Sequence, residues 1–123
     1  MLIVDDCTDL CELISEMLSI SGYTSATAHD GAEALRLLRA GLRPRMILLD
    51  RAIPVLDGPQ FLDGAAGLLE GTRIVWMTGD ETMIDHPAVV GMLRKPFELD
   101  DLLRLVRAHV GGGGPPENSQ LAS

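Results

Sequence analysis

Cysteine is scarce in this sequence of 123 residues, and its two copies, Cys7 and Cys11, lie only four positions apart. Secreted scaffolds that depend on disulfides use more cysteine than this, so we expect a reducing, cytoplasmic location. A spacing of four would place both thiols on one face of a helix. No further cysteine and no paired histidine completes a ligand set, which argues against a zinc site.

Long basic and long apolar runs are also missing. The formal net charge is −8 at pH 7 with no Lys/Arg-rich run, so direct nucleic-acid binding is not expected. No stretch approaches the roughly 20 apolar residues that cross a bilayer. The apolar start is interrupted at once by Asp5 and Asp6, unlike a signal peptide. We therefore expect neither membrane insertion nor a secretory leader.

Short apolar runs alternate with segments of helical periodicity from residue 1 to about residue 110. This alternation predicts one α/β domain with an open, parallel, doubly wound sheet. Strands are expected at 1–4, 24–28, 46–49, 73–77 and 91–95. Helices are expected at 10–18, 32–40, 58–69 and 98–110. Gly64 and Gly67 each cost about 1 kcal/mol in a helix, so the third helix should be weak. Residues 111–123 have the Gly/Pro-rich composition of a flexible tail.

Polar residues stand where the expected strands end. Asp5 and Asp6 follow the first strand, Asp50 the third, Thr78 the fourth and Lys95 the last. The carboxyl ends of parallel strands share one edge of the sheet, and ligands of open α/β sheets bind there. The sequence therefore predicts that these side chains converge.

The charges of these side chains suggest their roles. Closely packed carboxylates repel one another and take up protons or a cation, and an all-oxygen set suits Mg²⁺. Asp50 would be a nucleophile that forms an acyl phosphate. Lys95 and Mg²⁺ would hold the phosphoryl oxygens, and the Thr78 hydroxyl would donate to another.

Each of these residues also has a plain structural interpretation. Asp5 and Asp6 could be a helix N-cap, and Asp50 a cap or turn residue. Thr78 could belong to a simple turn, and Lys95 could be a solvated lysine. Their joint placement on one sheet edge favours the functional interpretation.

Four motifs together resemble the response-regulator receiver domain of two-component signalling. They are Ile3-Val4-Asp5-Asp6, then Ile47-Leu48-Leu49-Asp50 with Ile53-Pro54 and Asp57-Gly58, then Trp76-Met77-Thr78-Gly79, and Lys95-Pro96-Phe97. The resemblance spans residue 1 to about residue 110. It implies a flavodoxin-like, five-stranded parallel sheet in the order 2-1-3-4-5.

The resemblance also implies roles and partners. Asp50 matches the phosphoacceptor, Thr78 the switch hydroxyl and Lys95 the phosphate-pairing lysine. The implied Mg²⁺ ligands are Asp5, Asp6, Asp50 and the backbone carbonyl of Ala52. A histidine kinase or phosphotransfer protein would supply the phosphoryl group, and a downstream protein partner would respond, with a homodimer left open. Such a domain catalyses its own phosphorylation and slow dephosphorylation but is not otherwise an enzyme.

The sequence departs from the family pattern near its output surface. Met92 stands three residues before the lysine, where the switch aromatic is expected. The interval from Thr78 to Lys95 is short, and residues 81–90 hold Pro87 and little helical periodicity, so we predict a shortened or missing fourth helix. A receiver-like binding module with little or no phosphorylation-driven switching is therefore the alternative hypothesis. An aspartyl-phosphate phosphatase is disfavoured, because Ala52 stands where its second aspartate would be.

Overall fold

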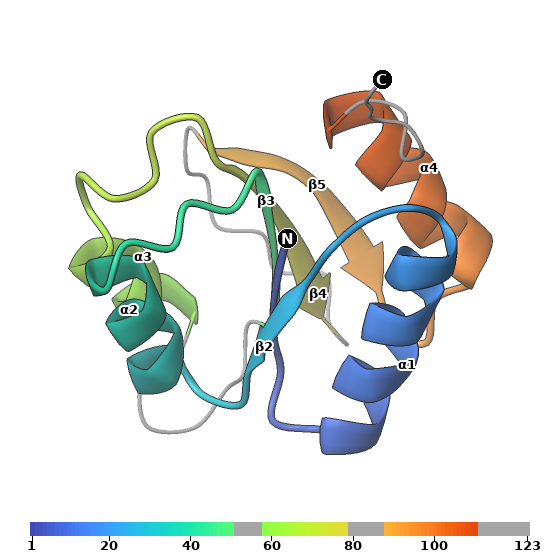
Figure 1. Ribbon diagram of the computed structural model, residues 1–123, viewed down its shortest axis with the longest axis horizontal. Coiled ribbons are helices and arrows are strands. Elements are labelled where there is room, and N and C mark those ends of the chain that lie inside the picture. The colour runs from blue at the N-terminus through green and yellow to red at the C-terminus, as the bar shows by residue number, and fades with distance from the viewer. Residues whose placement is uncertain (51–57, 79–87, 111–123) are drawn as a thin grey trace.

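Five parallel strands form one sheet in the order β2-β1-β3-β4-β5 (Figure 1). The computed structural model describes residues 1–50, 58–78 and 88–110. The strands are β1 (Leu2–Val4), β2 (Ala26–Ala28), β3 (Met46–Asp50), β4 (Arg73–Thr78) and β5 (Val89–Arg94). This order confirms the predicted doubly wound, flavodoxin-like sheet.

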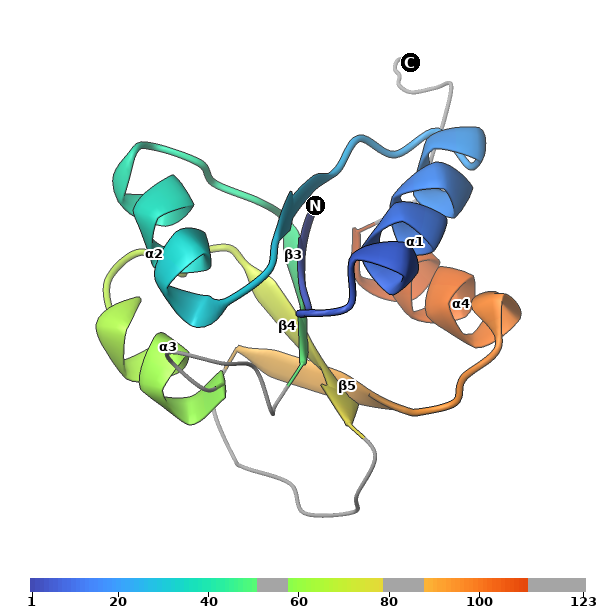
Figure 2. The same cartoon turned by 90° about the horizontal axis from the view of Figure 1, so that it is seen from below.

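Helices cover both faces of this sheet. They are α1 (Thr8–Ile20), α2 (Gly31–Arg39), α3 (Gly58–Gly64) and α4 (Leu99–Val110). Viewed from below, α1 and α4 lie on one face, and α2 and α3 lie on the other (Figure 2). Each strand therefore has to bury side chains in both directions, which explains why β3 is apolar along Met46–Leu49 without alternation.

Alternate strand residues enter two separate cores. Ile3, Leu48 and Val75 pack with the buried side chains of α1 and α4. Leu49 and Trp76 pack with those of α2 and α3. Because the side-chain period of a strand is two, a register displaced by one residue would send these side chains to the wrong face of the sheet.

Local signals at the helix ends behave largely as the sequence predicts. Asp30 is the N-cap of α2, and its Oδ1 accepts from the backbone N–H of Glu33 at 2.7 Å. The carboxylate of Glu33 accepts in return from the backbone N–H of His29 at 2.7 Å. This reciprocal arrangement satisfies donors that the first helical turn would otherwise leave unpaired. After α2, Gly41 has a φ of 114°, a conformation that favours glycine over other residues.

Several predicted boundaries are shifted: the first helix is longer by two residues at each end, and the second strand starts at Ala26 instead of residue 24. The third helix ends at Gly64 instead of residue 69, because Gly67 has a φ of 84° and belongs to a turn. The last strand starts at Val89 instead of residue 91, and it pairs with β4 through a register shift at Ile74 and Val75. The β-branched Val89 and Val90 suit this extension.

The expected shortening of the fourth family helix falls mainly on residues 79–87, which lie outside the described residues. In the part of the chain that is described, Ala88 is a turn residue and leads directly into β5. The predicted tail at 111–123 also lies outside it. None of the four helices has the length and apolar character of a membrane span.

Candidate functional site

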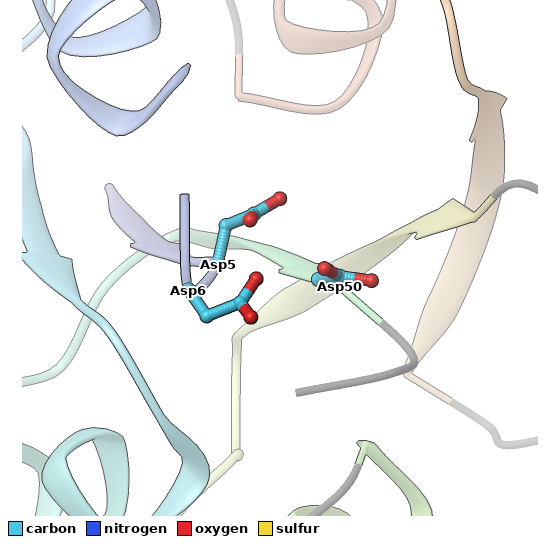
Figure 3. Close-up of side chains that lie close together, drawn as sticks. All are labelled: Asp5, Asp6 and Asp50. Atoms are coloured by element: carbon cyan, nitrogen blue, oxygen red, sulfur yellow. The ribbon is translucent and has the colours of Figure 1, made fainter. Parts of the chain in front are cut away.

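Three carboxylates gather at the carboxyl edge of the sheet. Asp5 and Asp6 follow β1, and Asp50 is the last residue of β3 (Figure 3). Each contributes an oxygen that lies within 4.8 Å of the other two. Asp5 is fully buried, Asp50 is 8% exposed and Asp6 is exposed. The predicted convergence of these three residues is therefore present in the structure.

Lys95 joins this carboxylate cluster from the residue directly after β5. Its Nζ donates to Oδ2 of Asp5 at 2.7 Å and to Oδ2 of Asp50 at 3.2 Å. Partial burial by itself lowers the pKa of Lys95, but the hydrogen bond that Lys95 donates to Asp5 and the charge of Asp50 outweigh that effect, and the pKa lies above its ordinary value. Lys95 is thus an ion-pairing residue of the cluster and not a solvated lysine.

Asp5 is held on both sides by the backbone around it. Its backbone N–H donates to the carbonyl of Ala28 in β2 at 3.1 Å. Its Oδ1 accepts from the backbone N–H of Cys7 at 2.9 Å. Cys7, and neither Asp5 nor Asp6, is the N-cap of α1, and its side chain makes no capping bond. The N-cap interpretation of the acidic pair is therefore wrong.

Of two further predicted site residues, Thr78 is placed by its backbone only and Ala52 is not placed. The backbone of Thr78 ends β4, where Thr78 pairs with Arg94 and the preceding Met77 pairs with Asp50. The ladder thus carries Thr78 to the same edge as Asp50. Ala52, whose carbonyl was the expected fourth metal ligand, lies outside the described residues, so that role stays a prediction.

The cluster of Asp5, Asp6, Asp50 and Lys95 is suited to a hard cation. Three carboxylates against one ammonium leave two negative charges uncompensated within it. Removing a carboxylate from water is costly unless it is paired, and Asp5 and Asp50 are both buried. Oxygen donors at this spacing match the preference of Mg²⁺, which binds through one or two carboxylates and retains several waters.

Cys11 contacts the backbone of Asp5 in the carboxylate cluster, and the sequence did not predict this contact. Its Sγ donates to the backbone carbonyl of Asp5 at 3.4 Å, and the side chain is 1% exposed. Burial and the neighbouring charge of Asp5 raise the pKa of Cys11 to about 11. The sequence predicted only that Cys7 and Cys11 share a helix face, whereas in the structure Cys11 is buried and Cys7, at the N-cap, is exposed.

Cys7 and Cys11 should therefore differ sharply in reactivity. At about pH 8 roughly one Cys11 thiol in a thousand is ionised, and only the thiolate attacks an alkylating agent. Cys7 is exposed. We expect iodoacetamide to add once to the folded protein, at Cys7, and twice after unfolding in urea, as measured by intact mass and peptide mapping. Rapid double labelling of the folded protein would contradict the burial of Cys11.

Comparison with known proteins places the whole described domain in one family. Residues 1–107 match the family model of the response regulator receiver domain. The chain belongs to this family. The receiver domain is 32% identical to Sporulation initiation phosphotransferase F of Bacillus subtilis over 114 residues, which cover 89% of this chain and 91% of that protein. It is 34% identical to Response regulator MprA of Mycobacterium tuberculosis over 112 residues, covering 87% of this chain and 48% of that protein.

Solved structures show the same fold. A CheY-like receiver domain protein from Methanospirillum hungatei superposes with a TM-score of 0.75 at 30% identity, over 85% of this chain and 87% of that one. Chemotaxis protein CheY4 of Vibrio cholerae gives a TM-score of 0.75 at 28% identity, over 88% and 95%. The chain is thus a receiver domain of two-component response regulators. It spans about half the length of the MprA proteins that it matches.

Proposed function

We propose that this receiver domain accepts a phosphoryl group on Asp50 from a histidine kinase or phosphotransfer protein, and that Mg²⁺ assists. The observation that carries the proposal is the position of Asp50 at the end of β3, with the acidic pair on one side and Lys95 on the other. A buried carboxylate beside a cation-binding pair and an ammonium is what transfer of a phosphoryl group requires.

The transfer itself makes one bond and breaks one. An oxygen of the Asp50 carboxylate attacks the phosphorus of a phosphohistidine, the new O–P bond forms, and the N–P bond breaks. The released imidazole keeps the electron pair of that bond and takes a proton from solvent. The ammonium of Lys95 already lies 3.2 Å from Asp50 Oδ2, and it can neutralise charge on an equatorial phosphoryl oxygen. The hydroxyl of Thr78 would donate to another such oxygen.

The Mg²⁺ site of this proposal consists of Asp5, Asp6 and Asp50, with the carbonyl of Ala52 as a further ligand. The bound ion would supply positive charge that reduces the repulsion between the anionic phosphoryl group and the carboxylate of Asp50. Within the cluster, Asp6 is the exposed member, so it is the ligand most accessible to an entering hydrated ion.

Phosphorylation of Asp50 would change how the domain binds a protein partner. The relative from Bacillus subtilis is named a phosphotransferase, which favours onward transfer of the phosphoryl group as one output. Homodimerisation is a second output that the proposal leaves open. We place the protein in the cytoplasm, and we assign it no catalysis beyond its own phosphorylation and slow dephosphorylation.

Phosphorylation of the wild-type protein tests this proposal directly. The protein is incubated with acetyl phosphate and Mg²⁺, and its intact mass is compared with that of a sample containing EDTA. We expect a gain of one phosphoryl group in the sample with Mg²⁺ and none in the sample with EDTA. Reductive cleavage of the acyl phosphate and peptide mapping should locate the group on Asp50. No gain under any donor, or a gain on another residue, would contradict it.

The alternative, a binding module that switches little, is supported by Met92. This residue pairs with Trp76 across β4 and β5 and packs against the core on the side of α2 and α3. A methionine can repack there, but it carries no ring or hydroxyl that could respond to Thr78. Beryllofluoride, a phosphoryl mimic, separates the two hypotheses: amide spectra that change only around Asp50 favour the module, and changes that extend to β5 favour the switch.

Asp6 offers a test of metal binding that does not disturb the core. Because its side chain is exposed, Asp6→Asn should change the free energy of unfolding by less than about 0.5 kcal/mol without metal. Mg²⁺ should raise the Tm of the wild type, because a ligand that binds the folded state stabilises it, and the rise should be largely lost in Asp6→Asn. Thermal unfolding with Mg²⁺ and with EDTA measures this. Asp63→Asn, an exposed aspartate of α3, is the matched control and should retain the full rise.

A further inference from the structure

An arginine-rich edge lies at the opposite end of the sheet from the carboxylate cluster. It comprises the end of α2 and the connection to β3, and its arginines are Arg36, Arg39, Arg43 and Arg45. All four are exposed. Residues 34–49 contain these four cations and no acidic residue, in a chain whose net charge is −8. We call this surface the arginine edge.

The arginine edge and the phosphoacceptor are separated by the full length of β3. Arg45 precedes the first residue of that strand and Asp50 is its last, so about 16 Å of extended chain lies between them. In Figure 1 the connection from α2 leads to the upper end of β3, whereas the connection from β1 to α1 lies at the lower end of the strands. A molecule bound at the arginine edge would therefore not cover Asp50.

Part of the arginine edge has a clear structural role. Nη1 of Arg43 donates to the carbonyl of Leu38 at 2.6 Å and to that of Leu42 at 2.8 Å, which satisfies acceptors at the end of α2. Arg36 and Arg39 stand in the last turn of α2, where cations interact favourably with the helix dipole. These roles explain three arginines, but they do not extend to Arg45, which lies beyond the helix.

The segment that carries Arg45 is held rigidly by its neighbour. The buried hydroxyl of Thr72 donates to the carbonyl of Pro44 at 2.8 Å. The backbone N–H of Arg73 donates to the carbonyl of Arg45 at 2.9 Å. A surface whose backbone is fixed in this way loses little backbone entropy when it binds a partner.

Within the described residues, the salt bridges do not include a guanidinium group of the arginine edge. Across the described ranges, Arg36, Arg39 and Arg45 form no ion pair. The nearest acids along the chain are engaged elsewhere, since Glu33 contacts His29 at the start of α2 and Asp50 contacts Lys95. Among the described residues, the positive charge of this edge is therefore not balanced by a carboxylate in contact with it.

We propose that the arginine edge docks a carboxylate-rich segment of a partner protein. Planar guanidinium groups pair with carboxylates through two parallel hydrogen bonds, and all four cations of the edge are arginines. A long polyanion such as nucleic acid would also run over the acidic remainder of the surface, which repels it, whereas a short acidic segment need touch only the edge. This inference goes beyond the proposed function, because such docking does not require phosphorylated Asp50.

Binding of a labelled oligoglutamate peptide tests the docking proposal. Fluorescence anisotropy at physiological salt should show binding to the wild type, and Arg39→Glu/Arg45→Glu should weaken it by about tenfold or more. The matched control is Arg104→Glu/Arg107→Glu, which makes the same change of charge on exposed positions of α4 and should alter affinity by about twofold at most. A milder pair, Arg39→Gln/Arg45→Gln, covers the case in which charge reversal at the end of α2 impairs folding, as checked by circular dichroism.

Several results would overturn the docking proposal. Absence of peptide binding to the wild type, or equal loss in the two charge-reversed pairs, would show that the edge is not a site. Tighter binding of a single-stranded oligonucleotide of equal formal charge would assign the edge to nucleic acid instead. Because the peptide is tested without phosphodonor first, failure here and failure of Asp50 phosphorylation are distinguishable.

Discussion

Asp50→Asn is expected to abolish the gain of a phosphoryl group from acetyl phosphate in the presence of Mg²⁺, while the protein remains folded. An asparagine amide at the end of β3 cannot act as the anionic nucleophile that forms an acyl phosphate. The amide is nearly the same size, and its oxygen can still accept from Lys95. Removing one of three clustered negative charges also relieves repulsion, so we expect the free energy of unfolding to stay within about 1 kcal/mol of the wild type.

The measurement is intact mass after timed incubation, with urea unfolding as the check on stability. Asp63→Asn on α3 is the matched control, since it makes the same chemical change at an exposed position. It should be phosphorylated at the wild-type rate. If Asp50→Asn gains the same mass as the wild type, another residue accepts the phosphoryl group and the assignment of Asp50 is wrong.

Much of the fold follows from short-range patterns that the sequence displays. The continuous apolar run of β3 is typical of a strand covered on both faces, and the 3–4 spacing in α1 and α4 identifies the faces that cover it. The strand order came from the family resemblance and not from periodicity, because alternating strands and helices are compatible with several orders.

The site was predictable to the extent that strand ends share an edge. That rule predicted that Asp5, Asp6, Asp50 and Lys95 lie close together, and they do so in the structure. The rule could not show that the hydrogen bond of Lys95 to Asp5 is shorter than its bond to Asp50. It also could not show that Cys11 contacts the carbonyl of Asp5. Both contacts depend on how α1 and β5 pack. The predicted end of α3 failed for a related reason: the positive φ of Gly67 is a choice of local backbone that composition alone does not dictate.

The arginine edge shows another limit of linear patterns. Spacings of three, four and two residues do not form a basic run, and the net charge of −8 argues against any cationic surface. Folding places the four arginines at one end of the sheet and the carboxylates of Asp5 and Asp50 at the other. Positive and negative charge are therefore separated along the direction of the strands, and the net charge of the chain does not show this separation.

Lys95→Met is the substitution with the largest expected effect on stability. Lys95 is the only described cation that contacts Asp5 and Asp50, and without it the fully buried carboxylate of Asp5 keeps a hydrogen bond from the N–H of Cys7 alone. Breaking a fully buried pair from one side costs about 3–5 kcal/mol, and because the side chain of Lys95 is 30% exposed we expect a smaller loss, roughly 2 kcal/mol.

The control for this loss is Arg104→Met on α4. Arg104 pairs with Asp101 at 3.2 Å, but the two side chains are 75% and 49% exposed, so the pair should contribute at most about 0.5 kcal/mol. Urea unfolding in EDTA measures both variants. Equal losses in the free energy of unfolding would show that burial of Asp5 does not strengthen its ion pair with Lys95.

Mg²⁺ should reverse much of the loss in Lys95→Met. Without the ammonium, the carboxylate cluster has three negative charges and no internal cation, so it should bind a divalent ion more tightly than the wild type does. We therefore expect a larger Mg²⁺-induced rise in Tm for Lys95→Met than for the wild type. Phosphorylation should nevertheless remain slower, by roughly 10²-fold, because the ion cannot replace the ammonium at the second phosphoryl oxygen. If Mg²⁺ restores both the stability and the phosphorylation rate of Lys95→Met, Lys95 only balances charge in the cluster and has no role in the transfer step.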